Sequence, residues 1–242
     1  MRVLVIMPAY NEGAVIRKVV EEFTAWKSAL PDTECDCVVV DDGSMDDTAS
    51  ILKDLGCPVI ELPMNLGIGG AVQTGYMYAR REGYDAAVQM DGDGQHPPEY
   101  IDTLLRPVLS GEADLVLGSR FLTEGGFRSS ALRRCGIRFL SGIIRLVTGE
   151  RLRDVTSGFR AANATAIRLF ARRYAKDYPE PESLVQAIEA GLRVKEVPVR
   201  MRERRGGESS IAGLGSAYYM IKVTLAVLIA GMQKKKSREG VK

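Results

Sequence analysis

The chain has 242 residues, of which 45% are hydrophobic and 26% are charged. A chain of this length and composition can bury a full core, which argues against disorder and favours one large α/β domain, or one domain with an appendage. The formal net charge is only +2, yet the last fifty residues carry 12 Lys and Arg against 4 Asp and Glu. A basic end on a mildly acidic body argues against nucleic acid as the partner and indicates a local anion, either a membrane surface or a phosphate.

Short β-branched runs alternate along the chain with amphipathic stretches of helical length. Strands are predicted over 3–7, 37–41, 58–62, 85–90 and 114–118, and helices over about 12–30 and 46–55, from about 67 to 76, and after Pro97 and Pro98. Alternation of this kind with apolar strands predicts a largely parallel sheet covered by helices on both faces. Ligands of such sheets bind beyond the carboxyl ends of the strands.

The predicted strands end in polar motifs: "PAYNE" (8–12), "DDGSMDDT" (41–48), "DGDGQH" (91–96) and "GSRF" (118–121). Asp91 and Asp93 offer hard oxygen ligands that suit Mg²⁺ or Mn²⁺, which usually takes one or two carboxylates plus substrate phosphates. The alternative is that "DGDG" is only an Asx-type turn. Of Asp41 and Asp42, one is expected to form a turn or cap and the other to bind a base or ribose, while Asp46, Asp47 or Thr48 caps the next helix.

Three other classes of chemistry find little support. The stretch "GIGG" (67–70) lacks G-x-G-x-x-G spacing and does not follow the first strand, so a Rossmann dinucleotide site is not expected. His96 is the only histidine and precedes two prolines, so it is interpreted as a turn residue. A single histidine also argues against Ser-His-Asp and Cys-His hydrolases. The four cysteines lack paired C-x-x-C spacing and are interpreted as reduced thiols.

Two apolar stretches in the second half of the chain carry basic residues. In a helix over 128–149, Arg134, Arg138 and Arg145 fall within about 40° of one another at 100° per residue. They are expected to lie opposite the apolar residues Leu132, Phe139, Ile143 and Leu146. This arginine face is either a solvated surface or a phosphate-binding one beside a membrane. The stretch 214–238 is interrupted by Lys222, which makes a membrane span costly by roughly 2.5 to 3.5 kcal/mol. It is either a core helix or, preferably, an interfacial helix with its lysine tail on anionic lipid.

Seven motifs taken together resemble a known family. They are "PAYNE", "VVVDDGSMDDT", "NLGIGGAVQTG", "DGDGQHPP", "GSRF", "DVTSGFRAAN" and "EVPVRMRERRGGESS". The set resembles the family 2 inverting glycosyltransferases, in the branch of dolichyl-phosphate mannosyltransferase-like enzymes that act on polyprenyl phosphates. The match covers residues 3 to about 212. It implies an α/β GT-A fold over 1–212, followed by a membrane-associated apolar helix and basic tail over 213–242.

The resemblance also implies roles for individual residues. Those implied to bind the nucleoside are Pro8, Tyr10, Glu12 and Asp42, and those implied to hold a divalent ion, Mg²⁺ or Mn²⁺, are Asp91, Asp93 and Gln95. With Asp93, the catalytic groups would be Arg120 and Arg134, which would hold the acceptor's phosphate. Arg138 would bind substrate, and Arg204 and Ser209 would sit on a closing loop. The sequence departs from the family pattern at Arg138, where a serine is expected, and at Ser210, where lysine often follows "GES".

The expected function is metal-dependent, inverting transfer of a sugar from a nucleotide-sugar donor to a polyprenyl (dolichyl or undecaprenyl) phosphate. A lipid phosphate is already an anion, so this acceptor needs positioning by arginines rather than a general base. The alternative is transfer to a sugar hydroxyl in polysaccharide synthesis, which requires a carboxylate base. A non-catalytic module would have to account for the intact aspartates and Arg120. Because "VLVIM" is too short for a signal-peptide core, the protein is expected at the cytoplasmic face of the membrane, with room for a small membrane-protein partner.

Overall fold

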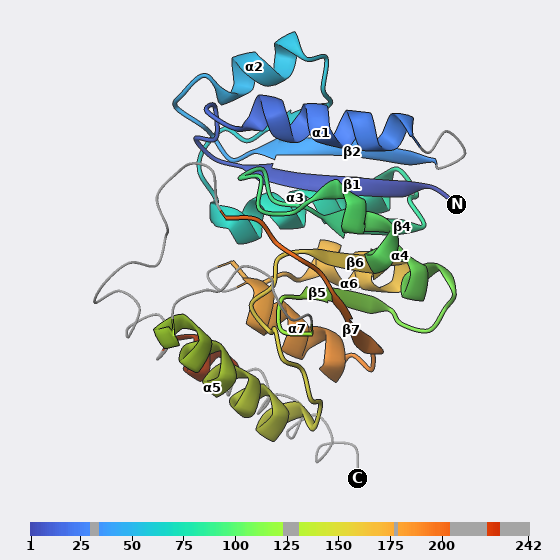
Figure 1. Cartoon of the computed structure of the whole chain (residues 1–242), viewed down its shortest axis with the longest axis vertical. Helices are drawn as coiled ribbons and strands as arrows, with labels where there is room; N and C mark the ends of the chain where they lie inside the picture. Colours follow the sequence, from blue (N-terminus) through green and yellow to red (C-terminus); the bar gives the residue numbers. More distant parts are fainter. Residues whose placement is uncertain (30–33, 123–130, 177–178, 204–221, 228–242) are drawn as a thin grey trace.

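The structure is a computed structural model that describes residues 1–29, 34–122, 131–176, 179–203 and 222–227. Within these ranges the chain builds a seven-stranded sheet in the order β3-β2-β1-β4-β6-β5-β7 (Figure 1). The strands are β1 (Val3–Ala9), β2 (Cys35–Asp41), β3 (Val59–Glu61), β4 (Ala86–Gln89), β5 (Leu115–Ser119), β6 (Arg160–Asn163) and β7 (Val194–Pro198). All neighbouring pairs are parallel except those of β6, which runs antiparallel to both β4 and β5.

Helices cover both faces of the sheet. They are α1 (Ile16–Ser28), α2 (Thr48–Asp54), α3 (Gly67–Arg81), α4 (Ile101–Leu109), α5 (Ala131–Thr148), α6 (Ala164–Arg172) and α7 (Pro179–Glu189), and a single 3-10 turn, η1 (Pro98–Tyr100), precedes α4. The two faces follow from the alternation of side chains along a strand. In β1, Val5 packs in the apolar cluster that contains Phe23 of α1. Its neighbour Ile6 packs in the opposite cluster, which contains Tyr76 of α3 and Phe170 of α6.

The five strands predicted from the sequence are confirmed, with ends that shift by at most two residues. The helix expected over 12–30 begins only at Ile16, and the helix expected near 67–76 continues to Arg81. Strands β6 and β7 and helices α6 and α7 had not been predicted individually. Strand β6 makes the sheet mixed, because it enters between β4 and β5 from the opposite direction.

Helix α5 lies at the end of the molecule away from α1 and α2 (Figure 1). Its buried side is formed by Ile137, Leu140 and Ile144. Phe139 and Leu146, which the sequence places opposite the arginines, are not part of this buried side, because their side chains are 52% and 79% exposed. Each of them directly follows an exposed arginine, Arg138 or Arg145, so exposed apolar and basic side chains alternate on this helix. The solvent side of α5 is therefore both basic and apolar.

Of the C-terminal stretch, the structure describes residues 222–227, which are helical. Val223 and Val227 are buried in the same apolar cluster as Leu140 and Ile144 of α5, whereas Lys222 and Leu225 are exposed. In the described part of the chain, no helix has both the length and the hydropathy that crossing a membrane would need.

Candidate active site

The loops after β1 and β2 are joined by hydrogen bonds. The Asn11 amide N–H donates to Ser44 Oγ at 2.9 Å, and the Asn11 Oδ1 accepts from the Met45 N–H at 2.9 Å. One residue later, the Glu12 N–H donates to Thr48 Oγ1 at 3.0 Å. Asn11 adopts a positive φ of 53°, a conformation that asparagine tolerates better than most residues. The two loops that are expected to receive the nucleoside therefore form one connected rim.

The paired aspartates at the end of β2 have different roles. Asp41 accepts hydrogen bonds from the backbone N–H and hydroxyl of Ser44, so it is the turn-forming carboxylate. Asp42 is 3% exposed and accepts from the Leu66 N–H at 2.7 Å, which attaches the loop before α3. Burial raises the pKa of Asp42, and hydrogen bonds from backbone amides oppose that rise. The expected turn role of one carboxylate is confirmed, and nucleoside binding by Asp42 remains a prediction.

Asp91 and Asp93 lie just beyond β4, in a turn rather than in the pleated strand, because β4 ends at Gln89. The Asp93 Oδ1 accepts from the Gln95 N–H at 3.0 Å, which is the Asx-type turn weighed from the sequence. The Gly92 N–H donates to the Pro8 carbonyl at 3.1 Å, so this turn is attached to the end of β1. Both carboxylates remain partly exposed, and the Asp91 side chain is 29% exposed. Asp93 therefore forms this turn, while both carboxylates still reach the surface where a ligand can bind.

The carboxylates of this turn fit a divalent ion that is shared with a substrate. Asp91 and Asp93 are hard oxygen donors one residue apart, and Gly158 packs so closely that a Cβ there would lie 3.0 Å from Asp91 Oδ2. Among the described residues, no group of three His, Cys, Asp or Glu side chains gathers as a metal cage. Mg²⁺ commonly uses one or two carboxylates and completes its coordination with substrate phosphates and water.

His96 is a structural residue. Its ring is buried and stacks on Phe159 with centroids 4.7 Å apart and an interplanar angle of 8°. Its Nδ1 accepts from the Asp91 N–H at 3.0 Å, which requires an unprotonated nitrogen. Burial lowers the pKa of His96 to about 4, so the 3.8 Å approach of Nδ1 to Asp91 Oδ2 is not an ion pair at neutral pH. The interpretation of His96 as a turn residue is confirmed.

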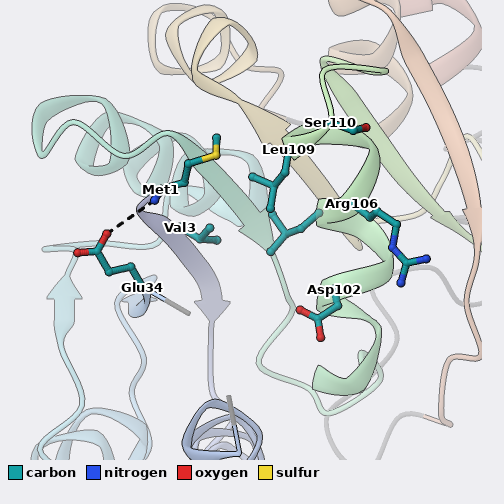
Figure 2. A pocket seen from close by; sticks show the side chains of 8 residues that line it. Met1, Val3, Glu34, Asp102, Arg106, Leu109 and Ser110 are labelled. Atoms are coloured by element: carbon teal, nitrogen blue, oxygen red, sulfur yellow. Dashed lines mark ion pairs between the residues drawn. The ribbon is translucent and has the colours of Figure 1, made fainter. Parts of the chain in front are cut away.

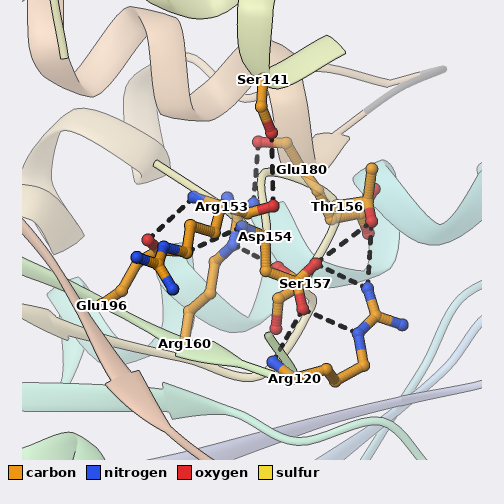
Figure 3. A network of polar contacts seen from close by, with 9 residues as sticks. All are labelled: Arg120, Ser141, Arg153, Asp154, Thr156, Ser157, Arg160, Glu180 and Glu196. Carbon is orange, nitrogen blue, oxygen red and sulfur yellow. Dashed lines mark hydrogen bonds and ion pairs between the residues drawn. The ribbon is translucent and has the colours of Figure 1, made fainter. Parts of the chain in front are cut away.

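Arg120 is held by a buried carboxylate that the sequence interpretation had missed (Figure 3). Its Nε and Nη2 each donate to a different oxygen of Asp154 at 2.7 Å, and Nη2 also donates to Thr156 Oγ1 at 3.0 Å. The side chain of Asp154 is 0% exposed and that of Arg120 is 8% exposed. Glu196 of β7 accepts from the backbone N–H groups of Arg153 and Asp154 and holds this loop in place. The motif "DVTSGFR" carried the signal, but its spacing does not reveal which residue pairs with Arg120.

A second buried arginine supports the same loop. Arg160 of β6 donates to the Ser157 carbonyl at 2.6 Å, to Ser183 Oγ at 3.0 Å and to the Glu180 carbonyl at 2.9 Å. These bonds connect the loop after Asp154 to the start of α7 (Figure 3). Burial raises the pKa of the Glu180 carboxyl, and the Arg160 guanidinium opposes that rise.

The remaining predicted site residues lie in several places. Tyr10 is 43% exposed at the rim, and Pro8 is buried in β1. On α5, Arg134 is half-buried and Arg138 is exposed. Arg204 and Ser209 lie outside the described residues. The chain just before them is described, and the Arg202 N–H donates to the Gln95 carbonyl at 2.9 Å.

A groove near the amino-terminal ends of the strands is not part of this site. Its lining includes Met1, Glu34, Asp102 and Leu109, which lie around the beginning of β1 and along α4 (Figure 2). The aspartates of the β4 turn and Arg120 follow the carboxyl ends of their strands, where ligands of open α/β sheets bind.

Comparisons with known proteins agree with the geometry. The chain is 32% identical over 250 residues to the undecaprenyl-phosphate mannosyltransferase of Micrococcus luteus, with 100% of both chains covered. It is also 32% identical to the polyprenol monophosphomannose synthase of Mycolicibacterium smegmatis, with 92% of this chain and 85% of that protein covered. The structure of glucosyl-3-phosphoglycerate synthase from Mycobacterium tuberculosis, in complex with Mn²⁺ and UDP-glucose, superposes with a TM-score of 0.72 at 25% identity and covers 95% of this chain and 78% of that one.

The sheet, the carboxyl-edge aspartates and the order of the motifs thus point to the same class of enzyme as the comparisons. The expected α/β GT-A fold is confirmed. The family model for glycosyl transferase family 2 matches residues 4–172. The chain belongs to glycosyl transferase family 2 and is a glycosyltransferase.

Proposed function

We propose that this enzyme transfers one sugar, with inversion, from a nucleotide-sugar donor to the phosphate of a polyprenyl phosphate. The observation that carries the proposal is that two part-exposed carboxylates and an arginine held by Asp154 all follow the carboxyl ends of strands in one sheet. Relatives named for transfer to undecaprenyl, polyprenol and dolichyl phosphates support the choice of acceptor, and the first of these is covered over its whole length.

The donor side of the site is assigned to the rim built by the β1, β2 and β4 loops. Tyr10, Glu12 and Asp42 would bind the nucleoside, with Pro8 holding the β4 turn against β1. Asp91 and Asp93, with Gln95, would hold Mg²⁺ or Mn²⁺ against the diphosphate. A divalent ion there stabilises the negative charge that develops on the leaving nucleoside diphosphate. The described residues fix the turn in advance, through Asp93 Oδ1 and the Gly92 N–H, so little reorganisation is needed on binding.

The acceptor side is assigned to Arg120 and Arg134, with Arg138 at the edge. Arg120 uses Nε and Nη2 for Asp154 and Thr156, and among the described residues no hydrogen bond occupies its Nη1. A guanidinium clamped on one side keeps a fixed direction for the donors on its other side, which suits recognition of a phosphate. A phosphate monoester attacks as an anion, so the site would need to orient this nucleophile rather than deprotonate it.

The exposed side of α5 supports action at a membrane surface, which we assign to the cytoplasmic face, with the protein bound peripherally or by one short apolar anchor. Two exposed pairs on this helix each combine an arginine with a large apolar residue. They are Arg138 with Phe139 and, seven residues later, Arg145 with Leu146. Apolar side chains beside cationic ones are typical of helices that lie in a lipid interface, where each basic residue near anionic lipid contributes about 1 kcal/mol. A small membrane protein could share this surface.

The test is a transfer assay with purified protein, labelled nucleotide sugars, and either a short polyprenyl phosphate or the matching polyprenol. We expect transfer only to the phosphate, loss with EDTA, restoration by Mn²⁺, and loss in Asp93→Ala. Asp102→Ala is the matched control, because Asp102 is an exposed aspartate in the groove near the amino-terminal ends of the strands. The configuration at the anomeric carbon, measured by NMR, decides inversion. Metal-independent transfer, or equal transfer to the matching polyprenol, would refute the proposal.

A further inference from the structure

Gln89 is a buried polar side chain at the end of a central strand. It is 1% exposed, and it lies in β4 between Ile6 of β1 and Arg160 of β6 in the register of the sheet. The three residues before it in β4, Ala86, Ala87 and Val88, are all apolar and buried. A fourth apolar side chain would continue this pattern. A buried amide is costly unless both of its ends are hydrogen-bonded. The partners of Gln89 therefore indicate why an amide is placed there.

Both ends of the Gln89 amide have partners. Its Nε2 donates to Asp91 Oδ1 at 3.2 Å, and its Oε1 accepts from the Tyr174 hydroxyl at 3.4 Å. The amide orientation is consistent with chemistry, because a carboxylate only accepts whereas a phenol can donate. Tyr174 is buried, and burial raises its pKa, so its hydroxyl remains a donor. A chain of two hydrogen bonds thus runs from the segment after α6 to the first aspartate of the β4 turn.

Gly158 also packs against this arrangement. A Cβ at this position would lie 3.1 Å from Gln89 Nε2 and 3.0 Å from Asp91 Oδ2. The Gln89 amide therefore has the Tyr174 hydroxyl as a hydrogen-bond partner and the Gly158 backbone close by, which leaves it little room to move. A lysine at position 89 would pair with Asp91 and reduce its attraction for a cation, whereas a neutral amide orients the carboxylate and leaves its full charge.

We propose that Gln89 and Tyr174 are positioning residues that hold the Asp91 carboxylate in the orientation that binds the divalent ion with the nucleoside diphosphate. The inference rests on the proposed metal role of Asp91 and adds the groups through which the sheet and the segment after α6 control it. Hydrogen-bonded partners of metal ligands typically change metal affinity by about 10-fold to 100-fold when they are removed.

The test measures Mn²⁺ binding directly, by electron paramagnetic resonance of free Mn²⁺ in the presence of UDP or GDP. Gln89→Leu removes the amide at similar size, and Tyr174→Phe removes only the hydroxyl. The matched control is Tyr76→Phe, because the Tyr76 ring packs against Tyr174 with centroids 5.6 Å apart, and its buried hydroxyl has no hydrogen-bond partner among the described residues. Thermal midpoints of all variants show whether each one folds.

We expect Gln89→Leu to weaken Mn²⁺ binding about 10-fold and Tyr174→Phe to weaken it about 2-fold to 3-fold, with Tyr76→Phe equal to wild type. The apparent Mn²⁺ constant for transfer should rise in parallel, while the KM for nucleotide sugar at saturating Mn²⁺ stays near that of wild type. Should Gln89→Leu be unfolded, Tyr174→Phe against Tyr76→Phe decides the question.

Asp91→Asn separates the inference from the function on which it rests. If wild type binds Mn²⁺ with nucleotide and Asp91→Asn does not, but Gln89→Leu and Tyr174→Phe bind like wild type, the positioning role is refuted and the metal site stands. If wild type itself shows no nucleotide-dependent Mn²⁺ binding, the proposed metal site fails, and the positioning role is overturned with it.

Discussion

The ion pair between Arg120 and Asp154 offers a demanding test of how the proposed acceptor side of the site is built. The pair is almost fully buried and bidentate, and Asp154 Oδ2 also accepts from the Arg120 backbone N–H at 3.0 Å. Asp154→Asn keeps the volume but removes the charge and presents an amide N–H₂ to a guanidinium that can only donate. The arginine is then left in a buried place without its counter-charge.

Breaking a buried pair by removing one partner typically costs about 3 to 5 kcal/mol. Because the Arg120 side chain keeps 8% of its exposure, we take the lower end, about 3 kcal/mol, for Asp154→Asn. For a chain of this size a loss of 1 kcal/mol lowers the melting temperature by about 2 to 4 °C, so the expected decrease is about 6 to 12 °C. Calorimetry and urea unfolding at pH 7.5 measure it, and transfer activity should fall because Arg120 loses its fixed direction.

A double-mutant cycle distinguishes pairing from simple loss of packing. Arg120→Leu and Asp154→Leu each leave one buried charge alone, whereas the double variant leaves none. We expect the double variant to be more stable than the sum of the single effects predicts, with a coupling energy of about 1.5 kcal/mol or more. Additive effects, or a loss below about 1 kcal/mol in Asp154→Asn, would refute this account of the pair.

Three further predictions follow from single contacts. Gly158→Ala places a methyl 3.0 Å from Asp91 Oδ2, so it should lower the unfolding free energy by about 1 kcal/mol and weaken Mn²⁺ binding in the titration described above; wild-type affinity would contradict the close approach. The pKa of His96 is lowered to about 4 in the folded protein, whereas in the unfolded chain it is about 6.5, so the unfolded state binds more protons between these values and stability is lost as pH falls. Urea unfolding should therefore show about 1.5 kcal/mol less stability at pH 5 than at pH 6.5 from this group, and a smaller pH dependence in His96→Asn; an equal slope would contradict it. Exposed Cys135 should be alkylated by iodoacetamide at pH 8 well before Cys35, whose pKa burial raises to about 12, and mass spectrometry of peptides after timed quenching would show the order.

Local patterns determined much of the fold and of the proposed donor side. The apolar run "VLVIM" specifies a buried strand because both of its faces are covered, and "DGDG" specifies a turn because Asp93 can bond a backbone N–H two residues away. These interactions join residues close in sequence, so spacing reveals them. The placement of Asp91, Asp93 and Arg120 at one edge followed from the parallel strands alone.

Long-range contacts decided the rest. Asp154 lies 34 residues from Arg120, and Tyr174 lies 85 residues from Gln89, so no spacing rule connects them. Strand β6 was hidden for a similar reason, because its four residues pair with β4 and β5, far away along the chain. The spacing of apolar and basic residues in α5 predicts an amphipathic helix. Which of its apolar residues are buried depends on the side that the rest of the protein covers, and that side leaves Phe139 and Leu146 exposed. The sequence alone determined which groups reach the rim, and only tertiary packing decided which buried partners hold them, because those partners are selected by proximity in space.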